Sequence, residues 1–216
     1  MGVLVKSNIQ RLIQQMPPLI EPHDPNCLKS ATYDLRLGDE YIKNGAFDKL
    51  DENKKPYLEI PEHDVVIVST YEKINMPTNL VGRFGIRLNL VMKGLVLNNE
   101  PQIDPGYSGK LFCILYNLSD EPITLRYKQP FATIEFEETK SVAPPYKEGY
   151  QGAEHVFDVV KDRLPKSGLR KLWDEFRDLR KDLNQRVDRL YTWFFTMVTI
   201  IMAILGILVA RILGLL

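Results

Sequence analysis

The segment "IDPGYSGKLFCILYN", residues 103–117, opens with a turn signal and continues as an apolar run. Asp104, Pro105 and Gly106 combine a side chain that bonds to nearby backbone, a fixed φ angle and a residue that tolerates positive φ, which favours a tight turn. The run after Gly109 is rich in aromatic and aliphatic residues, which is typical of a buried strand. It contains no acidic residue. We therefore predict a turn followed by a core strand.

Similar short β-type runs, separated by turn residues, recur on both sides of this segment. The predicted strands cover residues 32–38, 56–60, 64–70, 80–86, 94–98, 109–118, 123–127 and 131–137. Many short strands at regular spacing indicate an all-β barrel or jelly roll. A short helix is expected over residues 8–15, because Ile9, Leu12 and Ile13 share one face. The sequence has no Gly-rich phosphate loop, nucleophile elbow or Rossmann fingerprint.

Charge and cysteine content limit the chemistry of the predicted β domain, residues 1–160. It carries 17 basic and 22 acidic side chains and has no Lys/Arg cluster interleaved with aromatic residues, which argues against nucleic-acid binding. Cys27 and Cys113 do not lie at metal-binding spacing, and we expect two buried free thiols. The motif of zinc-dependent nucleobase deaminases is absent, so that chemistry is excluded and no metal site is predicted.

Residues 191–216 are predicted to form a transmembrane helix. Residues 191–210 carry no charge, and twenty helical residues extend about 30 Å, the thickness of a bilayer core. Tyr191 and Trp193 lie where an interfacial aromatic belt is expected. Residues 161–190 contain ten Lys and Arg residues, which places the N-terminal domain in the cytoplasm by the positive-inside rule. We predict a single-pass, tail-anchored protein with membrane lipid as a partner.

Two features of the predicted span leave alternatives open. Arg211 either reaches the far membrane interface with its side chain or faces other helices or a water-filled path. Gly206, Ala210 and Gly214 recur every four residues, which would permit close approach of helices.

Residues 161–190 are predicted to form an amphipathic coiled-coil stalk that begins near Pro165 and Gly168. Apolar residues follow heptad spacing with one four-residue stutter, and charged residues fill the positions between them. The alternative is a single amphipathic helix that lies on the domain or on the membrane surface. The narrow stripe favours self-association. The predicted oligomerisation residues are Leu169, Leu172, Phe176, Leu179, Leu183, Val187 and Leu190.

Four stretches of the chain resemble the deaminase branch of the dCTP deaminase and dUTPase superfamily. They are "LIEPHDPNCLKSATYDLRLGDEYI" (19–42), "YEKINMPTNLVGRFGIR" (71–87), "IDPGYSG" (103–109) with "LYNLSDEPITL", and "APPYKEGYQG" (143–152). The resemblance implies a mainly β, dUTPase-like distorted β-barrel or jelly roll followed by the long C-terminal helix. It also implies a homotrimer with nucleotide sites between subunits. No cofactor is implied, except magnesium if a nucleoside triphosphate is bound.

The resemblance also shows where the phosphate-binding residues of the family should lie. The family pattern G-R-S-S-L-A-R-L-G-L falls on "IRLNLVMKGL", residues 86–95. Arg87 keeps the first arginine, but Leu88 and Asn89 replace the two serines, and Met92 replaces the second arginine. Phosphate recognition depends on charge-assisted donors, each contributing about 1.5–3 kcal/mol. We therefore expect a large loss of triphosphate affinity.

The general acid/base of the family is a glutamate five residues after Ser-Gly, and that position holds Ile114. A side chain without a titratable group cannot transfer the proton, a contribution of about 10²–10⁴-fold in rate. We therefore predict no catalytic residue, with Asp104 as the one residual candidate. The predicted nucleotide contacts are Arg87, Asn89, Asp104, Tyr107 and Tyr146.

Three functions are compatible with this sequence. The first is a catalytically inactive, membrane-anchored trimer that binds or senses a nucleotide or serves as an assembly module. Its comparison with a defence effector rests on an analogy of architecture. The second is an active, membrane-tethered dCTP deaminase or dUTP hydrolase with an atypical site. The third is an oligomeric membrane scaffold without a ligand.

Overall fold

The computed structural model describes residues 2–98, 102–147, 149–160 and 168–213, without the side chains of residues 169 and 210. The predicted first part of the stalk, residues 161–167, and Gly214 lie outside the described residues. The chain divides into two compact units, Met1–Arg170 and Lys171–Leu216.

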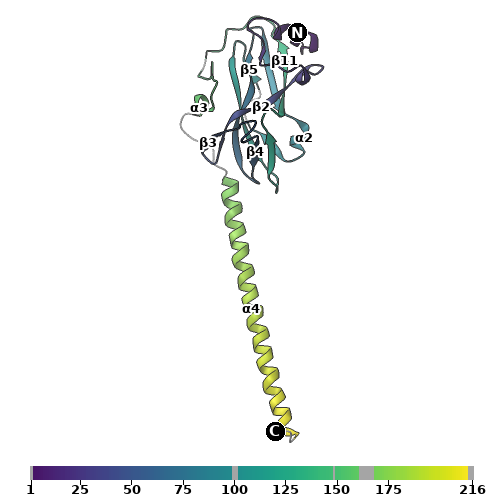
Figure 1. Ribbon diagram of the computed structural model, residues 1–216, viewed down its shortest axis with the longest axis vertical. Coiled ribbons are helices and arrows are strands. Elements are labelled where there is room, and N and C mark those ends of the chain that lie inside the picture. Colours follow the sequence, from purple (N-terminus) through teal and green to yellow (C-terminus); the bar gives the residue numbers. More distant parts are fainter. Residues whose placement is uncertain (1, 99–101, 148, 161–167, 214–216) are drawn as a thin grey trace. The chain divides into compact units, whose positions relative to one another are not determined.

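The first unit is mainly β, as predicted (Figure 1). Its long sheet has the order β7-β9-β5-β2-β11-β6-β8, with β1 on β5 and β3 on β2, and all of these pairs are antiparallel. A second sheet pairs β10 with β4. The elements are α1 (Lys6–Ile13), β1 (Ile20–Glu21), η1 (Pro25–Cys27), β2 (Thr32–Lys43), β3 (Ala46–Lys49), β4 (Tyr57–Ile60), β5 (Val65–Asn75), β6 (Leu80–Ile86), α2 (Leu88–Val91), β7 (Leu95–Leu97), β8 (Gln102–Ile103), β9 (Ser108–Asn117), β10 (Ile123–Arg126), β11 (Pro130–Glu138) and α3 (Val156–Val159).

Strand β9 alternates between a core face and a partly covered face. Leu111, Cys113 and Leu115 point into the main core, whereas Phe112 and Ile114 lie on the other face. Both predicted free thiols are buried and unpaired. Burial raises the pKa of the Cys113 thiol to about 12, so this group stays protonated and inert at neutral pH.

The sequence prediction ended the first long strand at Gly38, but β2 continues to Lys43. Gly38 lies against β5, where an added Cβ would come within 2.4 Å of Ser69 Oγ and 2.6 Å of the Thr70 carbonyl oxygen. The register of the β2–β5 pair shifts between Leu37 and Tyr41, on either side of this glycine. Gly38 therefore permits close backbone approach at an irregularity rather than ending the strand.

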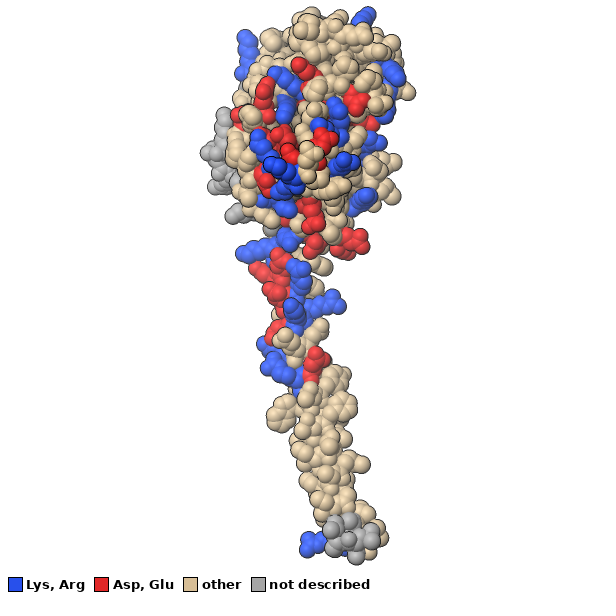
Figure 2. Space-filling model, viewed as in Figure 1, with Lys and Arg blue, Asp and Glu red and all other residues tan. Residues whose placement is uncertain are grey.

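The second unit contains most of α4, a continuous helix over Gly168–Ile212. Charged side chains gather on the first half of this helix and are nearly absent from the second (Figure 2). Within the helix, Arg170–Val209 contains an apolar window of mean hydropathy 2.3, long and apolar enough to cross a membrane. The described residues of the predicted stripe, from Leu172 to Leu190, are 46–70% exposed in the single chain.

Candidate functional site

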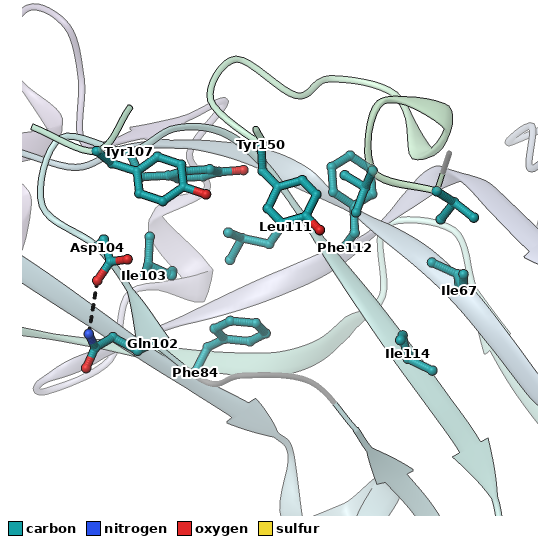
Figure 3. A pocket seen from close by; sticks show the side chains of 13 residues that line it. Ile67, Phe84, Gln102, Ile103, Asp104, Tyr107, Leu111, Phe112, Ile114 and Tyr150 are labelled. Carbon is teal, nitrogen blue, oxygen red and sulfur yellow. Dashed lines mark hydrogen bonds between the residues drawn. The ribbon is translucent and has the colours of Figure 1, made fainter. Parts of the chain in front are cut away.

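A cavity of about 370 Å³ opens on the first unit beside strand β9 (Figure 3). Its walls come from β5, β6, β8 and β9, from the turn between β8 and β9, and from the segment that follows β11. Of the predicted site residues, Asp104, Tyr107, Ile114 and Tyr146 line it, and Arg87 and Asn89 do not. The volume lies within the usual range for small-molecule sites.

Ile114 forms part of an apolar wall of the cavity. It lies directly opposite Ile67 in the antiparallel β5–β9 pair. Together with Phe112 and Val160 it packs against a small cluster that contains Ile67 and the buried Val156. An alkyl side chain among alkyl and phenyl groups can neither donate nor accept a proton. This wall therefore supplies no general acid or base.

Asp104 carries the one acidic side chain among the described residues that line the cavity. It lies in the turn before β9, and Gln102 Nε2 donates a hydrogen bond of 3.0 Å to its Oδ1 (Figure 3). The turn requires Gly106, which has φ +79° and whose Cβ would lie 2.7 Å from Pro145 Cα. The Tyr146 amide donates to the Pro105 carbonyl at 2.8 Å. The turn thus holds the segment around Tyr146, which follows β11, at the cavity.

Tyr107 and Tyr146 form an aromatic corner of the cavity. Their ring centroids are 5.8 Å apart in an edge-to-face arrangement. The Tyr107 hydroxyl donates to the Lys110 carbonyl at 2.5 Å. Burial, followed by the proximity of Tyr146, raises the pKa of Tyr107 above its ordinary value. The ring of Tyr107 therefore shapes the cavity while its hydroxyl is held by the backbone.

Residues 86–95, for which the family resemblance predicts phosphate contacts, include the short helix α2. Arg87 occupies the N-cap position of this short helix, and its Nη1 lies 2.9 Å from Asp34 Oδ2. The Asp34 side chain is only 7% exposed and also accepts a hydrogen bond from Thr133 Oγ1 at 3.1 Å. Leu88 and Met92 are 73% and 79% exposed. Arg87 is thus engaged with a buried aspartate, and the apolar side chains of Leu88 and Met92 lie at the surface.

A buried carboxylate that sequence reasoning missed holds the segment after β11 against the barrel. Glu40 accepts a hydrogen bond from the Val156 amide at 2.9 Å, and it lies 2.9 Å from His155 Nδ1 and 2.9 Å from Lys49 Nζ. Burial would raise the pKa of Glu40, but the contacts from Val156, His155 and Lys49 outweigh it and lower the pKa to about 2. These contacts of Glu40 hold the segment that ends at Val160, a residue of the cavity wall.

Several further lining residues were also missed at the sequence level. Phe84 and Phe112 lie on strands β6 and β9. In a strand, the sequence pattern does not distinguish an aromatic residue that lines a cavity from one that belongs to the core. Tyr150 lies in the stretch 143–152, whose resemblance to the family was the available signal. Across the described part of the chain, no group of three or more His, Cys, Asp and Glu side chains is placed to hold a metal ion.

The antiparallel β fold and the cavity beside β9 define a protein of the dUTPase and dCTP deaminase fold class. The family model described as dCTP deaminase-like matches residues 3–139, and the chain belongs to this family. It is 37% identical to the dCTP deaminase of Pyrococcus furiosus over 147 residues, covering 68% of this chain and 92% of that protein. It is 36% identical to the dCTP deaminase of Pyrococcus abyssi over 139 residues, covering 64% and 88% respectively.

A solved structure supports the fold assignment. The crystal structure of 2′-deoxycytidine 5′-triphosphate deaminase from Agrobacterium tumefaciens matches with a TM-score of 0.55 at 17% identity. The match covers 63% of this chain and 48% of that chain.

Proposed function

We propose that this chain is a membrane-anchored, homotrimeric dCTP deaminase-like protein that does not deaminate, and that its domain binds a ligand or assembles at the membrane. The observation that carries the proposal is Ile114 at the position of the family's catalytic glutamate, within an apolar wall. Deamination needs a group that activates water and returns a proton to the leaving amine. An isoleucine supplies neither step.

The former phosphate site supports the same conclusion. Leu88 and Met92 cannot donate to phosphate oxygens, and Arg87 is paired with Asp34. Loss of two or three charge-assisted donors costs several orders of magnitude in triphosphate affinity. Because the family resemblance places the site between subunits, the same losses apply to every site of a trimer.

The stripe on the first half of α4 supports self-association. Side chains such as Leu179 and Leu183 are 57% and 53% exposed in the single chain, between positions held by charged residues. Heptad-spaced apolar side chains become buried when helices supercoil about one another. A trimeric β domain, a stalk and three spans would share one threefold axis.

The membrane link is tested by flotation of the full chain with liposomes in a density gradient. We expect the protein to float with the vesicles and to resist extraction at high salt and high pH. A variant with Ile201→Asp and Leu205→Asp should sediment, because a charged residue at the centre of a span costs about 2.5–3.5 kcal/mol. A matched pair at Arg180→Asp and Lys181→Asp should still float. Flotation of the span variant would refute membrane anchoring by α4.

An active dCTP deaminase or dUTP hydrolase is the second candidate. It is favoured by the description of the relatives as dCTP deaminases and by Asp104, an exposed carboxylate at the cavity. Product formation from dCTP or dUTP separates this candidate from the first. A scaffold that binds nothing is separated from both by the absence of ligand binding at the cavity.

A further inference from the structure

The cavity beside β9 is lined by aromatic rings from several separate segments. Phe84 comes from β6, Phe112 from β9, Tyr107 from the turn before β9, and Tyr146 and Tyr150 from the segment after β11. In Figure 3 the rings of Tyr107 and Tyr150 lie on one side of the hollow and Phe84 on the other. Rings on opposite walls suit a flat aromatic ligand, which stacks on their faces or packs against their edges.

The charges at the cavity disfavour an anionic ligand. Its described lining contains no Lys, Arg or His and one carboxylate, that of Asp104. The lysines on the neighbouring strands are engaged elsewhere, because Lys73 Nζ lies 2.9 Å from Glu154 and Lys110 Nζ lies 3.5 Å from Asp39. A phosphate group at this cavity would meet a like charge, and none of the described lining residues of the chain is a cation that could compensate it.

The polar groups at the cavity are suited to an uncharged ligand that carries hydrogen-bond donors. The Asp104 carboxylate accepts one bond from Gln102 and has acceptor capacity left for an amino or hydroxyl group. Tyr150 is 51% exposed, and its ring also lines the cavity. A few polar groups on a mostly apolar wall fix the orientation of a small ligand.

We propose that this cavity binds an unphosphorylated nucleobase or nucleoside rather than a nucleoside triphosphate. The proposal rests on the proposed function, because an active deaminase of this family would have to hold the triphosphate. On this proposal the domain keeps a site for the aromatic ring of a nucleoside and does not recognise its phosphates. An aromatic heterocycle with an exocyclic amino group satisfies both the ring-lined walls and the Asp104 carboxylate.

The test is calorimetric titration of the full chain in detergent with deoxycytidine, dCMP and dCTP, the nucleotides with and without magnesium. The three ligands share one base and sugar and differ in the charge of the phosphate chain. We expect deoxycytidine to bind at least about tenfold more tightly than dCMP or dCTP. Equal or tighter binding of dCTP overturns the proposal, and so does the absence of deoxycytidine binding at millimolar concentration.

Two variants show whether binding occurs at this cavity. Tyr150→Leu should weaken deoxycytidine binding at least about fivefold, whereas Tyr57→Leu, at a tyrosine of similar exposure on β4, should leave it unchanged. Asp104→Asn should reduce the discrimination against dCMP several-fold, because it removes the like charge and keeps the shape. Equal effects of the two tyrosine variants, or unchanged discrimination in Asp104→Asn, contradict the assignment. Melting temperatures close to that of the parent protein establish that the variants are folded.

The proposed function and this proposal fail in different ways. Tight binding of dCTP without any turnover overturns the nucleoside assignment but agrees with the proposal that the domain is catalytically inactive. Conversion of dCTP to a uracil nucleotide overturns the proposed function itself.

Discussion

Ile114 on β9 and Ile67 on β5 stand opposite each other across one antiparallel strand pair, at the wall of the cavity. Their neighbours are also apolar, with Phe112 and Val160 packed against the same cluster. The alkyl side chain of Ile114 is therefore matched by its surroundings. An acid at this position would lose solvation without gaining a partner among these side chains.

This relationship predicts the effect of restoring the acid. Ile114→Glu should lower the free energy of unfolding by about 1–3 kcal/mol, because it places a polar group in an apolar wall. Ile114→Leu keeps the apolar character and should cost less than about 1.5 kcal/mol. Urea denaturation followed by circular dichroism measures both changes. A glutamate variant as stable as the leucine variant would show that the wall accommodates an acid.

The pairing of Arg87 with Asp34 predicts a structural role for Arg87. Arg87→Ala should destabilise the domain by about 1–2 kcal/mol, since it removes one partner of a buried carboxylate that keeps its bond from Thr133. Arg83→Ala breaks an exposed pair with Glu137 and should cost less than about 1 kcal/mol. Equal urea midpoints for the two variants would contradict this role.

Glu40 predicts how the segment after β11 is held. Glu40→Gln should increase amide hydrogen exchange in residues 154–160, because the carboxylate that accepts from the Val156 amide is weakened as an acceptor. Glu59→Gln, at an exposed glutamate on β4, serves as the control and should not change exchange there. Unchanged exchange in the Glu40 variant would mean that the apolar cluster alone holds the segment.

The same contact has a pH dependence with a defined sign. The folded-state pKa of Glu40 is lowered to about 2 from an ordinary value of 4.5. Its contribution to stability is therefore fully present above about pH 4.5 and is lost as the pH falls toward 2. The difference in urea midpoint between the parent protein and Glu40→Gln should shrink over this interval. A difference that stays constant from pH 5 to pH 2.5 would argue against an ionised Glu40.

The proposed self-association through the apolar stripe of α4 predicts a variant that lowers the oligomeric state. Leu183→Asp places a charge in the apolar stripe and should reduce the oligomer, measured by sedimentation of the full chain in detergent. Lys181→Asp introduces the same acid on the opposite face of the helix and should leave assembly intact. If both variants sediment as the parent protein does, the stripe is not the site of association.

Local patterns in the sequence predicted much of this fold. The alternation in residues 109–118 and the turn before it predicted β9, and counting from Ser108-Gly109 located Ile114. Contacts between residues far apart in the chain leave no periodic signal. His155 contacts Glu40, which is 115 residues away in the sequence, and Arg87 contacts Asp34, which is 53 residues away. The contacts of Glu40 with the segment after β11 and the pairing of Arg87 with Asp34 could therefore be found only in three dimensions.

Incubation of the full chain with dCTP and dUTP in the presence of magnesium tests the absence of catalysis most directly. The dCTP deaminase of Pyrococcus furiosus serves as the positive control, and products are separated by chromatography. We predict no dUTP, dUMP or pyrophosphate above the protein-free blank at any protein concentration. Product that increases in proportion to the protein and disappears in Asp104→Ala would contradict the account.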